Sequence, residues 1–221
     1  MIVGYLLATL IGFSLGIMGG GGSILTVPIL VYVLKMDPKV SIALSLAIVG
    51  TTSLVGVFNH FRANNINLKV AALFAPFAMV GTFFGAKISK FMSGEVQLIL
   101  FAIIMLLASV LMIKGRKEAE GEENKAIKIP LLAIQAIVVG VVTGLVGVGG
   151  GFLIVPALVL LTGLSMKKAV GTSLFIIALN SFSGFAGYLG IVAVDWAFLA
   201  KFSAFSIVGI LVGSQLVQYN S

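Results

Sequence analysis

Four consecutive glycines at positions 19–22 interrupt an uncharged hydrophobic run that extends over residues 2–34. A continuous helix of that length would measure roughly 50 Å, whereas the hydrocarbon core of a bilayer is about 30 Å thick. Each glycine costs a helix about 1 kcal/mol relative to alanine, and Pro28 lacks the N–H that a helix interior uses. The sequence therefore predicts a broken helix at this point.

A second Gly-rich break follows 128 residues later. Here Gly147-Val148-Gly149-Gly150-Gly151 precedes Pro156 inside another uncharged run, residues 129–166. Broken helices at matching places in two halves of a hydrophobic chain are typical of transporters whose binding site lies near the membrane midplane. The two breaks are therefore the first candidates for a functional site.

The composition indicates an integral membrane protein. Of the 221 residues, 60% are hydrophobic and only 10% are charged, whereas about a quarter of the residues of a soluble domain are charged. The apolar runs lack the alternation of β-barrel strands, so the spans are predicted to be helices. We expect an all-α integral membrane protein that crosses the bilayer several times.

Charge and residue types exclude several other classes. The net charge is +7, but the fourteen Lys and Arg are scattered over connections and helix ends, which is typical of headgroup contacts and not of a nucleic-acid surface. The chain has no cysteine, His-Glu metal pattern, nucleotide loop or nucleophile-base pair. We expect no enzyme activity, no metal site, no cofactor and no nucleic-acid partner.

The chain matches itself without a gap when it is shifted by 128 residues. The matched pairs include Gly16 with Gly144, Pro28 with Pro156, Ser45 with Ser173, Ser53 with Ser181, Gly81 with Gly209 and Gly85 with Gly213. A shared apolar composition would not keep glycines, prolines and polar residues in step over this range. The register predicts an internal duplication.

The duplication divides the chain into a first transmembrane repeat at 1–113, a polar linker at 114–128 and a second repeat at 129–221. After the first break we predict spans near 40–58, 68–88 and 96–113, with a polar loop at 59–67 and the last span facing lipid. Each repeat has about four helices. The partner of the fourth would begin near residue 224, so the second repeat is expected to lack it through truncation.

Three motifs carry a resemblance to a known family: Gly-Ile-Met-Gly-Gly-Gly-Gly-Ser-Ile-Leu-Thr-Val-Pro at 16–28, Gly-Leu-Val-Gly-Val-Gly-Gly-Gly-Phe-Leu-Ile-Val-Pro at 144–156 and Ala-Val-Gly-Thr-Ser-Leu at 169–174. With them, the chain resembles the sulfite exporter TauE/SafE family of bacterial and archaeal membrane permeases over essentially its whole length. The resemblance implies a secondary carrier of sulfite, sulfonates or related organic anions, built from two four-helix repeats in a prokaryotic plasma or inner membrane.

The breaks are expected to expose backbone N–H groups at residues 23–26 and 151–154, where the second part of each broken helix begins. Such amides and the helix dipole favour an anion, and glycine lets it approach the backbone closely. Tight helix packing without a ligand is the alternative. The candidate substrate-binding residues in the breaks are Gly19, Gly20, Gly21, Gly22, Ser23, Gly147, Gly149, Gly150 and Gly151.

A polar stripe on the second and sixth predicted spans supplies further candidates. Ser45 and Thr52 lie seven residues apart, hence on one helix face, and their repeat partners are Ser173 and Asn180. Thr172, Ser53 and Ser181 lie beside them. These groups can donate to an anion, or they can bond to their own helix or to neighbouring helices. The single histidine, His60, is expected at the membrane interface.

The expected function is secondary transport of a small anion, and export in particular, because moving one negative charge out of a cell that is negative inside is favoured by about 2.3 kcal/mol per 100 mV. We expect repeats of parallel sense, with the breaks facing each other near mid-bilayer. Re-entry of residues 23–34 and 152–162 would invert the repeats instead. An anion channel or a non-transporting scaffold are the alternatives, and a homo-oligomer is left open.

Overall fold

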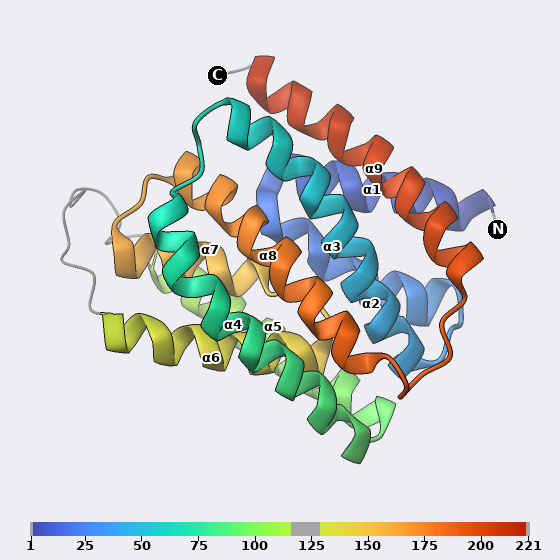
Figure 1. The fold of residues 1–221 in the computed structure, drawn as a ribbon. Helices are drawn as coiled ribbons and strands as arrows, with labels where there is room; N and C mark the ends of the chain where they lie inside the picture. Colours follow the sequence, from blue (N-terminus) through green and yellow to red (C-terminus); the bar gives the residue numbers. More distant parts are fainter. Residues whose placement is uncertain (1, 116–128, 220–221) are drawn as a thin grey trace.

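The computed structural model describes residues 2–115 and 129–219, which are helical over most of their length (Figure 1). Most of the predicted linker, 114–128, lies outside the described residues. Five helices in the described ranges are long and apolar enough to cross a membrane, and the stretches Val3–Ile17, Gly19–Val33 and Gly94–Val110 are apolar but shorter. The expectation of an all-α, multi-pass membrane protein is confirmed.

The first half begins with α1 (Ile2–Met18), which passes directly into the 3₁₀ helix η1 (Gly19–Leu25), the short α2 (Thr26–Pro28) and the π-helical η2 (Ile29–Val33). It continues with α3 (Pro38–Arg62), α4 (Leu68–Ile88), a 3₁₀ turn (Ser89–Phe91) and α5 (Gly94–Gly115).

The second half consists of α6 (Ile129–Val146), α7 (Gly151–Thr162), α8 (Met166–Tyr188) and α9 (Trp196–Tyr219). Its helices start at the predicted interval: α8 begins 128 residues after α3, and α9 begins 128 residues after α4. These starts support the predicted duplication. The predicted loss of a last helix concerns residues beyond the chain end and stays a prediction.

Two polar residues fix where the long helices of the first half begin. The Asp37 carboxylate accepts hydrogen bonds from the backbone N–H groups of Lys39 (2.9 Å) and Val40 (3.2 Å), and Pro38 follows it as the first residue of α3. Asn67 caps α4 in the same way by accepting from the N–H of Val70 (3.1 Å). Such caps satisfy N–H groups that have no partner inside the helix.

The predicted span 68–88 coincides with α4, but the predicted loop at 59–67 begins too early. The helix α3 continues to Arg62, and its last turn contains His60. In that turn the Asn59 side-chain N–H donates to the Ser214 hydroxyl of α9 (2.8 Å). This contact between two helices stabilises a polar turn that the sequence alone favours as loop.

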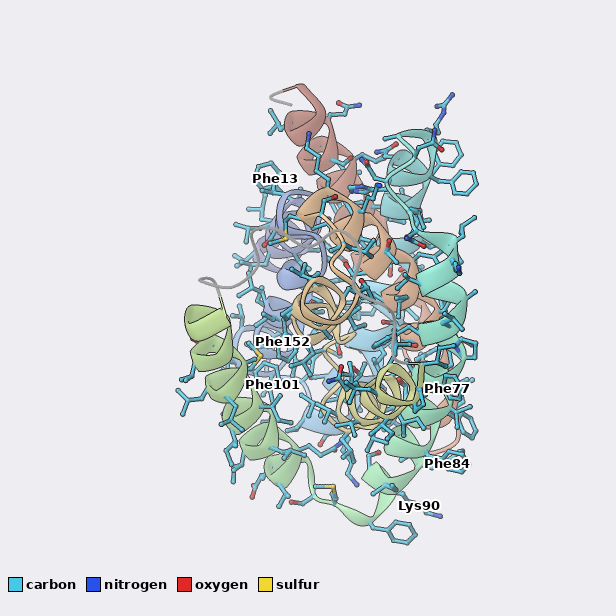
Figure 2. The ribbon with its side chains drawn as sticks, turned by 90° about the vertical axis from the view of Figure 1, so that its left-hand side faces the viewer. Phe13, Phe77, Phe84, Lys90, Phe101 and Phe152 are labelled. Atoms are coloured by element: carbon cyan, nitrogen blue, oxygen red, sulfur yellow. The ribbon has the colours of Figure 1, made fainter. Side chains whose placement is uncertain are left out.

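The helices form layers around a central pair. Figure 1 shows α3 and α8 side by side, with α1 and α9 on one side of them and α4 and α6 on the other. Figure 2 shows α5 on the outside, with its Phe101 near Phe152 of α7, and these two side chains belong to one hydrophobic cluster. As predicted for the fourth span, α5 is peripheral: Ile99 is 61% and Leu106 is 69% exposed.

Glycines bring the outer helices into backbone contact. A Cβ added to Gly12 in α1 would collide with the carbonyl oxygen of Ser206 in α9, and one added to Gly140 in α6 would collide with that of Ala78 in α4. The second contact repeats the first at an interval of 128 residues in both helices. Small residues allow this close approach of membrane helices, and the recurrence again supports the predicted duplication.

The two central helices run antiparallel. A Cβ added to Gly56 of α3 would lie 3.6 Å from the Leu174 side chain of α8, and one added to Gly184 of α8 would lie 3.1 Å from Leu46 of α3. Moving forward along α3 from residue 46 to 56 therefore means moving backward along α8 from residue 184 to 174.

By contrast, α9 runs parallel to both α3 and α1. The Thr52 hydroxyl of α3 donates to the Ser206 hydroxyl (3.1 Å), and Asn59 donates to Ser214 about two turns further along both helices. In α1, Gly12 faces Ser206 and Gly16 faces the next turn of α9 at Ile210. It follows that α1 and α3 point the same way, so the chain between them must turn back.

The returning segment lies against α1. A Cβ added to Gly22 would collide with the backbone of Leu15 near the end of α1, and one added to Gly4 near its beginning would lie 2.9 Å from the side chain of Leu34. The segment from η1 to η2 therefore folds back along α1 and forms a helical hairpin whose tip is the first glycine break.

The second half repeats this course in the opposite direction. In α4, Ala78 faces Gly140 and Thr82 faces Gly144, so α4 and α6 run parallel. The Ser183 hydroxyl of α8 donates to the Met79 carbonyl (2.8 Å), and Gly187 faces Ala86 one to two turns further along, so α4 and α8 also run parallel. The segment containing α7 must therefore return the chain along α6.

The directions of the helices show that the two halves are inverted. Because α1 is parallel to α3, α6 is parallel to α8, and α3 is antiparallel to α8, the first helices of the two halves point in opposite directions. The expectation of parallel-sense repeats is wrong. That expectation treated residues 2–34 as one interrupted crossing of the membrane, whereas the glycines form the tip of a hairpin.

Candidate functional site

The two glycine breaks meet inside the protein. A Cβ added to Gly20 would collide with the Cα of Gly151, and one added to Gly151 would collide with the Cα of Gly20. Both glycines are buried, as are Gly19, Gly22, Gly147, Gly149 and Gly150, whereas Gly21 is half-buried. The two breaks are therefore in contact and mostly buried, as predicted, and their depth in the membrane stays a prediction.

The meeting point lies beside the middle of the central helices. Ile177, the middle residue of α8, approaches both breaks: its side chain would be 2.7 Å from a Cβ at Gly20 and 3.3 Å from one at Gly149. From α3, the Val49 side chain would be 2.6 Å from a Cβ at Gly149, and residue 50 is the middle of that helix. The two hairpins thus enter the protein from opposite ends, and their tips meet halfway along α3 and α8.

The first break does not have the open backbone that its glycines predict. Residues 19–25 form a continuous 3₁₀ helix, so N–H groups after its first turn donate to carbonyls three residues earlier. The Ser23 hydroxyl also bonds within the break, donating to the Gly20 carbonyl (2.7 Å). The chain is interrupted earlier, at Gly19, whose φ angle is 62°. Residues 23–25 already lie inside the 3₁₀ helix that follows, so the expected exposure of their amides is a wrong prediction.

The second break is open, and its glycines are required. Gly147, Gly149 and Gly150 have φ angles of 78°, 69° and 73°, which place them in the left-handed region that glycine adopts without strain. Gly150 is the N-cap of α7 and offers no side chain to its first turn. A helix N-terminus is therefore presented at the centre of the protein with glycine backbone in front of it.

The number of available amides at this N-terminus is smaller than predicted. The N–H groups of Leu153 (3.0 Å) and Ile154 (2.9 Å) donate to the Gly150 carbonyl. Of the four amides predicted to be exposed at 151–154, only those of Gly151 and Phe152 stand in the first positions of the helix, where no carbonyl of the same helix can accept from them. A helix dipole equivalent to roughly half a positive charge adds to them.

Two hydroxyls without a partner lie against this open backbone. The Ser181 Oγ would be 3.2 Å from a Cβ at Gly149, and the Thr143 Oγ1 would touch a Cβ at Gly150. Ser181 is 0% and Thr143 is 1% exposed, and neither hydroxyl has a hydrogen-bond partner within residues 2–115 and 129–219. Buried polar groups are normally hydrogen-bonded, and those that are not call for an explanation.

Ser45, a predicted residue of the polar stripe, holds the start of the second break in place. The Ser45 hydroxyl donates to the carbonyl oxygens of Gly147 and Ile42, which ties the start of the break to α3. The hydroxyl is thereby used for holding backbone and is not free for an anion. Ser45 is thus brought to the site, but in a positioning role.

Three other candidates use their hydroxyls elsewhere. Thr52 donates to the Ile48 carbonyl and to Ser206, Thr172 accepts from the backbone N–H of Asn67 (2.9 Å), and Ser173 donates to the Val170 carbonyl (2.8 Å). These are the helix-bonding and helix-joining roles that the sequence left as the alternative. A substrate role for these three stays a prediction.

Asn180 is a predicted candidate whose buried side chain has no hydrogen-bond partner among the described residues. It is 0% exposed, and neither its amide nitrogen nor its amide oxygen finds a hydrogen-bond partner in the described part of the chain. It adjoins Ser181 in α8. Its substrate role stays a prediction, now with an unsatisfied buried amide to support it.

Sequence reasoning undervalued two residues of this site. Ser181 stood beside the polar stripe and was not singled out, although its repeat partner Ser53 is likewise buried and unpartnered in the described ranges. Thr143 was missed altogether. It lies one turn before Gly147, but its repeat partner is Leu15, so the repeat gave no signal for it.

The site is uncharged. No Asp, Glu, Lys or Arg among the described residues is buried, and these residues contain no group of three or more His, Cys, Asp or Glu that could hold a metal ion. The basic side chains lie at helix ends, where Arg62 lies over the Phe58 ring (5.3 Å) and Lys87 over the Phe83 ring (5.6 Å). Neutral donors are therefore what the protein interior offers to a ligand.

Comparisons with known proteins agree with this architecture. The family model "Sulfite exporter TauE/SafE" matches residues 5–221. A "Probable membrane transporter protein" of Xylella fastidiosa strain 9a5c is 32% identical over 211 residues, which cover 94% of this chain and 81% of that protein. The "Probable membrane transporter protein YdhB" of Bacillus subtilis is 29% identical over 210 residues, 93% and 86% of the two chains. No solved structure matches the chain.

Proposed function

The chain belongs to the sulfite exporter TauE/SafE family and is a multi-pass membrane transporter, not an enzyme, and we propose that it binds a small anion where the second glycine break faces α8. The anion lies against the N-terminus of α7 and accepts hydrogen bonds from the amides of Gly151 and Phe152 and from Ser181 and Thr143. Sulfite and organosulfonates are the cargo that the family description suggests.

The proposal rests on the Ser181 and Thr143 hydroxyls, which are buried and have no hydrogen-bond partner among the described residues, and on the N-terminus of α7, which no side chain caps. Leaving a buried hydroxyl unsatisfied costs about 1–3 kcal/mol, and a ligand that accepts from it removes this cost. A helix N-terminus favours a negatively charged ligand in the same place. Both features select an anion with several acceptor oxygens.

The inverted halves suggest how the anion crosses. In transporters built this way, the site lies at the interface between the repeats, and rocking one half against the other opens it to each side in turn. Here the interface is the contact between Gly20 and Gly151, midway along α3 and α8. We therefore propose alternating access around this contact, in the plasma or inner membrane of a prokaryote.

Export is the direction that needs no coupling ion. A monoanion leaving a cell that is negative inside gains about 2.3 kcal/mol per 100 mV. Uptake against that potential would require a bound cation, and no buried carboxylate is present in the described ranges to hold one. The proposal is therefore an exporter that is driven by the membrane potential and by the gradient of its cargo.

Removing the Ser181 hydroxyl is expected to weaken transport of sulfite and methanesulfonate. A hydrogen bond to a charged group contributes about 1.5–3 kcal/mol, which corresponds to a rise in half-saturating concentration of roughly 10- to 100-fold for Ser181→Ala. The measurement is the initial flux into liposomes that contain the purified protein, as a function of external anion concentration.

Ser203→Ala is the matched control, because Ser203 is another buried serine whose hydroxyl has no partner in the described chain, but it lies on α9 outside both breaks. It should leave the flux unchanged. Equal behaviour of the two variants would remove Ser181 from the site. Counterflow of labelled anion separates a carrier, which shows it, from an anion channel, which does not.

A further inference from the structure

We infer that Gln97, Tyr188 and the Leu145 carbonyl form a latch that keeps the second hairpin closed toward the end of the protein where α8 terminates. This latch must open before an anion can pass on that side. Gln97 and Tyr188 are positioning residues, since they act through the backbone of the hairpin and lie outside the proposed anion site. The inference rests on the proposed function, because it names the contact that alternating access has to break.

The first observation is the set of hydrogen bonds at the end of α6. The Gln97 side-chain N–H, from the first turn of α5, donates to the Leu145 carbonyl (2.6 Å) and to the Tyr188 hydroxyl (2.9 Å). The Tyr188 hydroxyl in turn donates to the same carbonyl (3.5 Å). Leu145 lies in the last turn of α6, where the helix itself provides no donor for a carbonyl. Three helices, α5, α6 and α8, are thereby joined directly before the second break.

The second observation is the burial of the latch. Gln97 and Tyr188 are both 0% exposed. Tyr188 lies about two turns, or roughly 10 Å, beyond Ser181 along α8. It packs in one hydrophobic cluster with buried residues of α2, α3 and α4, namely Val27, Ile42, Ala43, Leu46 and Ala86. An anion that leaves the second break toward this end must pass the cluster, so the cluster and the latch have to separate.

The chemistry of the latch suits a contact that opens and closes. Its three groups, an amide, a phenol and a backbone carbonyl, are neutral, so separating them leaves no unpaired charge in the protein interior, as breaking a buried ion pair would. Each neutral hydrogen bond shifts an equilibrium by only roughly 3- to 10-fold. In the open state, water can replace the lost partners at little cost. The latch is therefore strong enough to favour the closed state and weak enough to be reversible.

The third observation is that the first half lacks the corresponding contact. The repeat partners of Leu145 and Tyr188 are Ile17 and His60. Ile17 is 43% exposed, and the Nδ1 atom of the half-buried His60 has no hydrogen-bond partner within residues 2–115 and 129–219. The first hairpin is therefore not tied to the end of α3 as the second is tied to the end of α8. We expect the described state to be closed more firmly at the α8 end.

The test measures how fast single cysteines in the purified full chain, in detergent, react with a cationic methanethiosulfonate, which modifies thiols that water reaches. The chain has no cysteine of its own. Ser41→Cys reports on the α8 end: Ser41 is 0% exposed, its hydroxyl has no partner in the described chain, and it lies one turn before Ser45 on the same face of α3. Ala169→Cys, at the repeat partner of Ser41, reports on the opposite end and is also 0% exposed in the native protein.

Weakening the latch is expected to expose the first reporter and not the second. Tyr188→Phe removes the phenol oxygen and keeps the ring, and Gln97→Met removes the amide and keeps the side-chain length. Each should raise the labelling rate of Ser41→Cys roughly 3- to 10-fold. The labelling rate of Ala169→Cys should stay unchanged or fall, because opening at one end accompanies closure at the other.

Tyr5→Phe is the matched control, because it removes the same hydroxyl from α1, where Tyr5 stacks on Phe205 (4.7 Å between ring centres). It should leave both labelling rates unchanged. Unchanged labelling of Ser41→Cys in both latch variants would overturn the latch. A rise shared by the two reporters would indicate general loosening of the fold and would overturn it as well.

The labelling assay needs no transport, so its result is independent of the flux measurements with sulfite and methanesulfonate. If the two reporters respond as expected but the unaltered protein shows no anion flux, the latch exists and the proposed function is wrong. If anion flux is present but the labelling rates do not respond, the proposed function stands and the latch does not.

Discussion

Replacing Gly151 with alanine is expected to reduce anion flux strongly while the protein still inserts into the membrane. The new Cβ would collide with the Cα, carbonyl carbon and carbonyl oxygen of Gly20, which are backbone atoms and cannot turn away as a side chain can. The two hairpin tips must therefore separate, which displaces the N-terminus of α7. Overpacking of this kind costs about 1–3 kcal/mol, and we expect the half-saturating concentration or the maximal flux to change by at least about tenfold.

Two further variants make this result specific. Gly20→Ala adds its methyl group at the other side of the same contact and should cause the same loss. Gly56→Ala is the control, because its Cβ would meet the far end of the Ile210 side chain (2.6 Å), which can rotate. Full flux in Gly151→Ala and Gly20→Ala would mean that the meeting of the breaks does not matter for transport.

Cysteines placed in the loops after α3 and after α8 are expected to be labelled from opposite sides of the membrane. Because α3 and α8 run antiparallel, their final residues lie at opposite ends of the protein. The chain has no cysteine of its own, and Ala63 and Ala193 are exposed alanines in these two loops. The single variants Ala63→Cys and Ala193→Cys therefore report on one position each, with a small change in side-chain volume.

A membrane-impermeant maleimide applied to sealed, uniformly oriented vesicles should label one of these variants, and the other only after the membrane is permeabilised. The effect is close to all or none, because the reagent does not cross the bilayer. Labelling of both cysteines from the same side would restore the parallel-sense arrangement and would contradict the helix directions described above.

The sequence was sufficient to predict which residues break the helices, because glycine runs and prolines act locally. Breaks were predicted at 19–22 and 147–151, and both are hairpin tips; the span at 68–88 also agrees with α4 in full. Helix propensity and hydrophobic length depend on neighbouring residues alone, so they are readable from the chain without knowledge of its tertiary contacts.

The direction of the chain after each break could not be predicted in the same way. The returning segments Gly19–Val33 and Gly151–Thr162 are shorter than an ordinary membrane span, and length does not say whether such a segment continues across or folds back. The answer depends on contacts such as those of Gly22 with Leu15 and of Gly4 with Leu34. These contacts bring together positions that no sequence pattern relates.

The roles of the polar residues were predictable only in part for a related reason. Ser45, Thr52 and Ser181 look alike in a sequence of apolar spans, but the first bonds to the Gly147 carbonyl, the second to Ser206 and the third to no described group. Which acceptor is near a hydroxyl is decided by helix packing. The same argument explains why Thr143, placed at Gly150 by the turn of α6 into the break, was missed.

The most direct measurement of the central claim is the position of a bound anion that can be located by its own scattering. Selenite has the shape of sulfite and contains selenium, and it is largely monoanionic near neutral pH. In a crystal of the full chain grown with selenite, the anomalous signal should lie at the N-terminus of α7, within hydrogen-bond reach of Ser181 and the Gly151 amide. A signal only outside the contact between the two glycine breaks, with this position empty at saturating selenite, would contradict the account.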